Sequence, residues 1–210
     1  MENCKKYSVA EEFFNAITHA IGIFLSIYGL VMLVVQSDTA IKTATTAIYG
    51  ASMLILFQSS TLYHAIAHEK AKRVFQKMDH SAIFILIAGT YTPILMLVVP
   101  FPHSVAVMSS VWYIAIMGIV FSCITLKYKY FSTVLYLILG WLSLFLFYFI
   151  WESPARDAIW YLLGGGVLYS LGCIFYLMKK KFCHGIWHLF VLGGAVLHYF
   201  CIMHLLKNIN

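Results

Sequence analysis

Seven long apolar segments, separated by short polar breaks, make up most of the 210-residue chain. The apolar runs lie at about 17–36, 43–66, 80–99, 104–126, 131–151, 157–178 and 185–206. Each has roughly the 20 residues that a helix needs to cross the hydrocarbon core of a bilayer. Because backbone polar groups in lipid must be paired within their own segment, each run is expected to be an α-helix. The pattern predicts an all-α membrane protein, a bundle of seven transmembrane helices in a single domain covering residues 1–210.

The basic residues collect in alternate breaks, and this asymmetry predicts the orientation. One side has Lys5, Lys6, Lys70, Lys72, Arg73, Lys77, Lys127, Lys129, Lys179, Lys180 and Lys181. The other side has only Lys42, Arg156 and Lys207. Short cytoplasmic loops are enriched in Lys and Arg. We therefore expect a multi-pass protein of the cell membrane, with its N-terminus in the cytoplasm and its C-terminus outside.

Composition excludes several other classes of protein. Hydrophobic residues make up 62% of the chain and charged residues only 10%, whereas soluble domains carry roughly 25% charged residues. The net charge of +6 comes from loops between apolar runs, so a nucleic-acid partner is excluded. The five cysteines are odd in number and have no disulfide-framework spacing. Glu11 and Glu12 directly precede the first run and no cleavage site follows it, so that run is expected to remain as a span.

With this topology, four predicted helices place polar residues near the cytoplasmic membrane boundary. They are Glu12, Asn15 and His19 of the first span, Ser60 and His64 of the second, Asp79 and His80 of the third, and His184 and His188 of the seventh. Polar groups within membrane spans are costly and usually have a function. The convergence of four helices at one depth therefore indicates a candidate site.

The histidines in this group have the spacing of metal ligands. His184 and His188 are four residues apart, so both project from one face of a helix. A third imidazole from His64 would complete three protein ligands and leave the fourth tetrahedral position open, as in catalytic zinc sites. Asp79 could then act as a base toward water, or orient a histidine. Zinc lowers the pKa of bound water to about 7, which would supply a nucleophile at neutral pH.

Structural readings of the same residues stay open. A histidine pair at this spacing also occurs as interfacial anchors or packed polar groups, so spacing alone does not decide for a metal. Glu12 is interpreted as a helix N-terminal charge rather than a ligand, and Asn15 as either a cap or a partner of a ligand. The histidines expected to face the inner loop or lie in the outer half, away from the site, are His68, His103, His198 and His204.

Four ordered motifs carry a family resemblance. They are residues 12–19 (EFFNAITH), Ser60-x3-His64, residues 79–93 (DHSAIF running into IAGTYTP), and His184-x3-His188 with residues 194–198 (GAVLH) behind it. On these motifs, which span almost the whole chain, it resembles the hemolysin III family, the bacterial branch of the progestin and adipoQ receptor (PAQR) group. The resemblance implies a seven-helix bundle with its N-terminus inside and a zinc ion near the cytoplasmic face.

The resemblance also implies roles for individual residues. It implies that His64, His184 and His188 hold the zinc, that Asp79 contacts the water on the zinc, and that Ser60 lies beside the site. The family is also grouped with alkaline ceramidases as presumed membrane hydrolases. Its bacterial members are named for a haemolytic, pore-like activity.

Three functional hypotheses follow. The first is a zinc-dependent hydrolase of a lipid amide or ester, with Asp79 and Ser60 as the catalytic residues and the lipid bilayer as the source of substrate. The second is a membrane-permeabilising, cytolytic protein, although no polar stripe repeats along several spans as a channel would require. The third is a lipid-state sensor with structural zinc, in which Asp79 or His68 would close the fourth position. Neither the substrate nor the oligomeric state is specified by the residue pattern.

Overall fold

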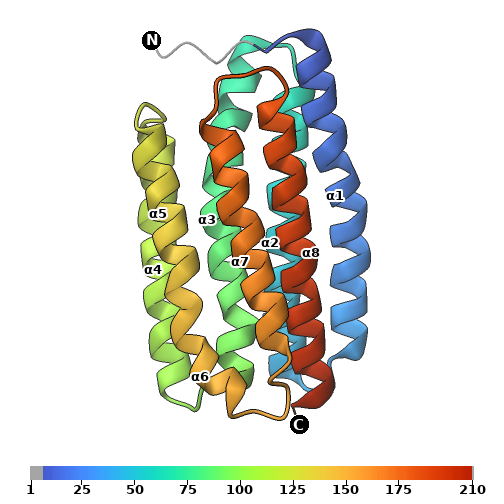
Figure 1. Ribbon diagram of the computed structural model, residues 1–210, viewed down its shortest axis with the longest axis vertical. Coiled ribbons are helices and arrows are strands. Elements are labelled where there is room, and N and C mark those ends of the chain that lie inside the picture. The colour runs from blue at the N-terminus through green and yellow to red at the C-terminus, as the bar shows by residue number, and fades with distance from the viewer. Residues whose placement is uncertain (1–6, 210) are drawn as a thin grey trace.

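The computed structural model describes residues 7–209, and helices are the only regular elements in that range. They are α1 (Val9–Gln36), α2 (Ala40–Ala65), α3 (Glu69–Val98), α4 (His103–Ile124), α5 (Lys129–Trp141), the 3-10 segment η1 (Leu142–Phe145), α6 (Leu146–Trp151), α7 (Ala158–Leu177) and α8 (Cys183–Asn208) (Figure 1). Cys4, Lys5 and Lys6, which entered the charge and cysteine arguments, lie outside the described residues.

Seven segments in the described range are long and apolar enough to cross a membrane, which confirms the predicted all-α, seven-span class. The fifth crosses as α5, η1 and α6 together, so its predicted run is interrupted by one 3-10 turn. Two helices begin well before the apolar runs, α1 at Val9 and α3 at Glu69. Ser8 and Glu11 form a reciprocal capping box at the start of α1, and the His68 side chain caps α3. These caps pair backbone N–H groups that a helix end leaves open, so both helices extend through polar sequence.

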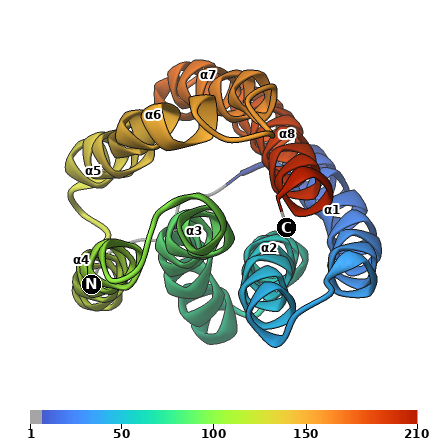
Figure 2. The same ribbon diagram turned by 90° about the horizontal axis from the view of Figure 1, so that it is seen from below.

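The helices are arranged as a ring when viewed along the bundle (Figure 2). Helix α1 packs between α2 and α8, α3 packs on α2, and α4 packs against the outer side of α3. The chain then returns through α5, η1 and α6 to α7, which packs along α8. The two halves of the sequence thus enclose a common interior.

The outward faces of the helices are apolar. Phe24, Tyr113 and Trp160 are each about two-thirds or more exposed, and they lie on three different spans. A water-soluble protein rarely exposes contiguous apolar surface on this scale. These faces are therefore suited to lipid chains.

Polar side chains inside the ring connect helices that are far apart in sequence. The Tyr49 hydroxyl of α2 donates a hydrogen bond to the Ala195 carbonyl of α8 at 3.0 Å. The Tyr91 hydroxyl of α3 donates to the Leu139 carbonyl of α5 at 2.8 Å. Because a buried hydroxyl without a partner is unfavourable, these bonds help specify which helices are neighbours.

The bundle gives a direct test of the predicted orientation. The start of α1 and the connection from α7 to α8 lie at one end, and the C-terminus lies at the other (Figure 1). In a bacterial host, we expect alkaline phosphatase fused after residue 209 to be active and green fluorescent protein fused there to be dark. Fusions after Lys180, in the α7–α8 connection, should give the opposite pair of results. The same result at both positions would contradict the bundle topology.

Candidate metal centre

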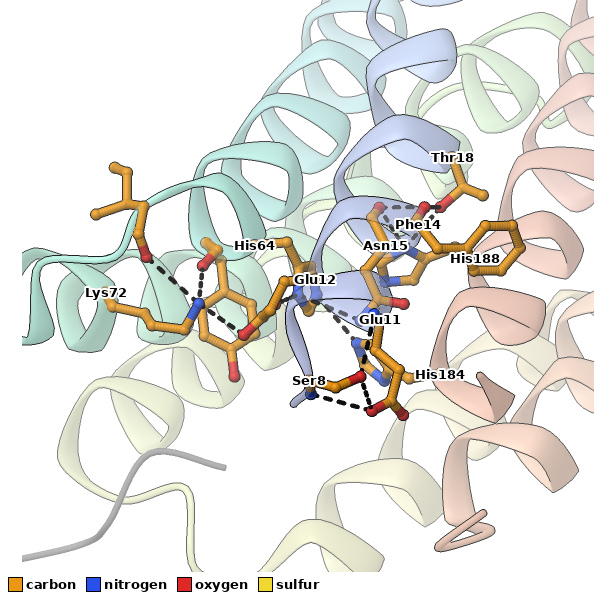
Figure 3. Close-up of polar contacts among 12 residues, drawn as sticks. Ser8, Glu11, Glu12, Phe14, Asn15, Thr18, His64, Lys72, His184 and His188 are labelled. Atoms are coloured by element: carbon orange, nitrogen blue, oxygen red, sulfur yellow. Dashed lines mark hydrogen bonds and ion pairs between the residues drawn. The ribbon is translucent and has the colours of Figure 1, made fainter. Parts of the chain in front are cut away.

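Three histidines from two helices converge at the end of the bundle where α1 begins (Figure 3). His64 lies in the last turn of α2, and His184 and His188 lie in the first two turns of α8. One ring nitrogen from each lies within 4.8 Å of the other two, and the Nε2 atoms of His64 and His184 are 3.2 Å apart. The three side chains are buried. The structure therefore brings together the three imidazoles whose spacing suggested a metal site.

The donor set fits a zinc ion. Zn–N bonds of about 2.0–2.1 Å at tetrahedral angles place ligand nitrogens about 3.3 Å apart, close to the separation of the His64 and His184 Nε2 atoms. The Nε2 atom of His188 is fully buried and has no hydrogen-bond partner, which is costly unless something else binds it. Within the described chain, no fourth His, Cys, Asp or Glu joins the set. Three protein ligands are the pattern of zinc sites with an open position.

Helix α1 orients His64. The Glu12 carboxylate lies 2.6 Å from His64 Nδ1, and its other oxygen forms an ion pair with Lys72 Nζ at 2.8 Å (Figure 3). An imidazole that donates its Nδ1 proton to a carboxylate presents Nε2 as the lone-pair donor. The interpretation of Glu12 as only a helix N-terminal charge was therefore incomplete. Sequence pattern could not reveal this contact, because it joins residues 52 positions apart.

The same helix orients His188. Its Nδ1 atom lies 3.0 Å from the Asn15 carbonyl oxygen and 3.1 Å from the Thr18 hydroxyl. The carbonyl can only accept, so Nδ1 carries the proton and Nε2 faces the other histidines. Asn15 also places its side-chain amide 3.4 Å from His64 Nδ1. Asn15 was expected to be either a helix cap or a partner of a ligand. The structure shows it in contact with two of the three histidines, His64 and His188.

A close approach between α1 and α8 makes these contacts possible. Gly185 lies between the two α8 histidines, and a Cβ atom there would overlap the ring of Phe14 on α1. The Glu11 carboxylate also accepts a hydrogen bond from the Phe182 backbone N–H at 3.2 Å. Phe182 has a φ of 61°, in the left-handed region, just before α8 begins. The first turns of the two helices are thus joined directly.

Asp79 lies close to Ser60 and lines a cavity. Asp79 is only 3% exposed, and the fully buried Ser60 hydroxyl is next to its carboxyl group without a hydrogen bond of regular geometry. The cavity has a volume of about 120 Å³ and is lined mainly by residues of α3, α5, α7 and α8. Tyr91 lines it as well, twelve residues further along α3, so the cavity extends about 18 Å along the bundle. Its walls are mostly apolar. The three histidines are not among the lining residues, but Asp79 is, as are Trp187 and His19, whose rings pack against His188.

The other histidines lie outside the metal set. His68 caps α3 and is exposed, as expected for the loop. His80 places its two ring nitrogens near the Gln76 carbonyl and the Tyr176 hydroxyl. In the half of the bundle away from the start of α1, His198 contacts the Leu162 carbonyl and lines the far part of the cavity.

Comparison with known proteins agrees with this architecture. The family described as "Haemolysin-III related" matches residues 7–199. The chain belongs to this family. It is 42% identical to Hemolysin-3 of Bacillus cereus over 93% of this chain and 91% of that protein. It is similarly related to the Hemolysin-3 homolog of Bacillus subtilis (strain 168), at 42% identity over 94% of this chain and 95% of that protein.

A more distant relative is the human protein named Monocyte to macrophage differentiation factor. It is 30% identical over 90% of this chain and 81% of its own length. The similarity to this human protein covers nearly all of the chain, which agrees with the resemblance to the PAQR group.

Metal binding by the three histidines can be tested directly. We expect the purified protein to hold about one zinc ion per chain, and His64→Ala or His188→Ala to remove most of it, because each leaves only two ligands. His204→Ala, near the far end of α8, is the matched control and should retain full stoichiometry. Zinc would be counted by plasma emission spectroscopy. Equal zinc in wild type and His188→Ala would exclude the site.

The contact between Glu12 and His64 predicts a weaker but distinct effect. Glu12→Gln should lower zinc affinity about 10–100-fold, because it removes the carboxylate that holds the His64 ring. Competition with a chromophoric chelator would measure the affinity. Glu69→Gln, at an exposed carboxylate of α3, should leave it unchanged. An unchanged affinity in Glu12→Gln would show that His64 needs no such partner.

Proposed function

We propose that this haemolysin III-related protein is a zinc-dependent hydrolase that cleaves an amide or ester bond of a membrane lipid. The observation that carries the proposal is the combination of an open three-histidine site with a buried carboxyl group, Asp79, at the same end of an apolar cavity. Structural zinc sites usually have four protein ligands. Three ligands next to a cavity favour a catalytic role over the sensor hypothesis with structural zinc.

His64, His184 and His188 would hold the ion. Bound there, zinc supplies a Lewis acid that polarises a carbonyl group and makes water nucleophilic near neutral pH. Glu12, Asn15 and Thr18 keep the ring nitrogens aimed at the centre. Their role is positional, because their contacts are to the histidines and not to the cavity.

Asp79 is the proposed proton carrier. As water attacks the carbonyl carbon, the carboxylate takes a proton from the water. It then donates that proton to the departing nitrogen or oxygen as the carbon–heteroatom bond breaks. Ser60, beside the carboxyl group, can hydrogen-bond to its charged form or to the oxygen that gains charge. The products would be a fatty acid and an amine or alcohol.

The cavity indicates the class of substrate. Its walls include Leu56, Ile83 and Ile87 close to the polar end, and it lies within spans whose outward faces contact lipid. An acyl chain is the membrane component that such an apolar space accommodates. With the N-terminus in the cytoplasm, as the charge asymmetry predicts, the reacting carbonyl would lie near the inner leaflet.

The role of Asp79 can be separated from zinc binding. Zinc-loaded protein in nanodiscs should release fatty acid from at least one member of a panel of lipid amides and esters. Asp79→Asn should lower kcat by about 10²-fold or more with zinc content unchanged, because it removes the proton carrier. Asp38→Asn is the matched control, since that carboxylate is exposed and paired with Lys42 at the other end of the bundle. An active Asp79→Asn variant, or no release from any lipid, would refute the proposal.

Dye release from liposomes addresses the permeabilising hypothesis, which the names of the Bacillus relatives suggest. Under the hydrolase proposal, leakage is absent or is lost in Asp79→Asn. Equal leakage from wild type and Asp79→Asn, without lipid cleavage, would instead favour membrane permeabilisation.

A further inference from the structure

His19 on α1 is a buried polar side chain with no role in the contacts described so far. It is 1% exposed, and within residues 7–209 neither ring nitrogen makes a hydrogen bond of regular geometry, although the His188 backbone lies close to the ring. The other polar groups of α1 near the site, on Glu12, Asn15 and Thr18, contact ring nitrogens of His64 or His188. A buried imidazole whose nitrogens lack well-formed hydrogen bonds is unfavourable, and another molecule that supplies a partner would remove that cost.

The ring of His19 is held in a fixed orientation. It stacks on the ring of His188 with centroids 3.6 Å apart and planes inclined by 14°. The ring of Phe57 packs against it edge-to-face, with centroids 5.1 Å apart. These contacts place the plane of the imidazole between the rings of His188 and Phe57.

The stacking also argues against His19 as a metal ligand. The lone pair of an imidazole lies in the plane of its ring, so an ion bound by His188 would lie near the plane of that ring. Because the two planes are nearly parallel and about 3.6 Å apart, such an ion would be far out of the plane of His19. Consistently, His19 is absent from the set of donor atoms within 4.8 Å of one another.

His19 instead borders the cavity. It lines the same end as Asp79 and Trp187, so a polar edge is present in an otherwise apolar wall beside the histidine cluster. A neutral imidazole offers one N–H donor and one acceptor. The donor is suited to a carbonyl oxygen, which is the polar atom that an amide or ester lipid would bring to this end.

We infer that His19 is a substrate-binding residue that donates a hydrogen bond to the carbonyl oxygen of a lipid amide or ester in the cavity. The inference rests on the proposed function for the substrate class. It goes further by assigning a contact to a residue outside both the metal set and the proton carrier. Because the two rings stack, the position of the His19 donor is fixed relative to His188, a proposed metal ligand.

The test compares two probes of equal chain length, N-methyldodecanamide and dodecane, on the zinc-loaded full chain in nanodiscs. Dissociation constants would be measured by tryptophan fluorescence, since Trp187 lines the cavity and contacts the His19 ring. His19→Phe keeps an aromatic ring for stacking but removes the donor. We expect it to bind the amide about tenfold more weakly, to bind dodecane as wild type does, and to retain zinc. His204→Phe, the same substitution outside the cavity, should match wild type.

Two further measurements keep the inference testable if His19→Phe folds poorly. His19→Gln, which keeps an N–H donor, should recover part of the amide affinity. In wild type labelled with 15N-histidine, one His19 ring nitrogen should shift when the amide is added and stay unchanged with dodecane. These signals would be assigned by their loss in the His19 variants.

Several results would overturn the inference. One is an unchanged amide affinity in His19→Phe. A second is a loss of zinc in that variant, which would make His19 a ligand. A third is an equal 15N shift with both probes, which would indicate that His19 binds only a water molecule in the cavity. Failure of the wild type to bind the amide would overturn it as well. If the amide binds through His19 but no lipid is cleaved, the binding role stands and the proposed hydrolase activity falls.

Discussion

A histidine buried in a membrane protein can direct one nitrogen to a metal only if its other nitrogen has a partner. Helix α1 meets this constraint for two of the three histidines. It supplies the Glu12 carboxylate to His64, and a backbone carbonyl with the Thr18 hydroxyl to His188. The three histidines are buried, so the partners of their rings come from the protein. The site therefore depends on α1 as much as on the helices that carry the ligands.

The same constraint explains the packing around the site. Gly185 has no side chain to keep α1 away from α8, and Glu11 joins the first turns of the two helices. Lys72 from α3 offsets the charge of Glu12, which would otherwise be poorly solvated. Three separate helices are thus fixed against α1 at one end of the bundle. The contacts that hold these helices together are short and polar. This is expected in a membrane, because lipid chains are as apolar as the side chains they compete with.

Beyond this polar end, the ring of helices encloses an apolar cavity instead of a fully packed core. Residues of α5, η1 and α6 line one side of it, and Figure 2 shows the chain returning through these elements to α7. Asp79 and His19 border the end nearest the histidines, so a ligand there would meet polar chemistry at only one of its ends. This separation of a polar end from an apolar space is suited to amphipathic molecules. It connects the membrane fold of the haemolysin III-related family with the chemistry proposed here.

The sequence by itself determined the seven apolar spans, the all-α class and the placing of His64, His184 and His188 near the same end of their helices, because bilayer thickness and helical periodicity act locally, whereas the meeting of the three rings needed the tertiary structure. Only the tertiary structure decided the partners of those rings, the cavity beside Asp79 and the stacking of His19. Such contacts join residues far apart in the chain, such as Thr18 and His188, 170 positions from each other. Their existence depends on the distance and rotation between packed helices, and residue spacing within one helix contains no information about either.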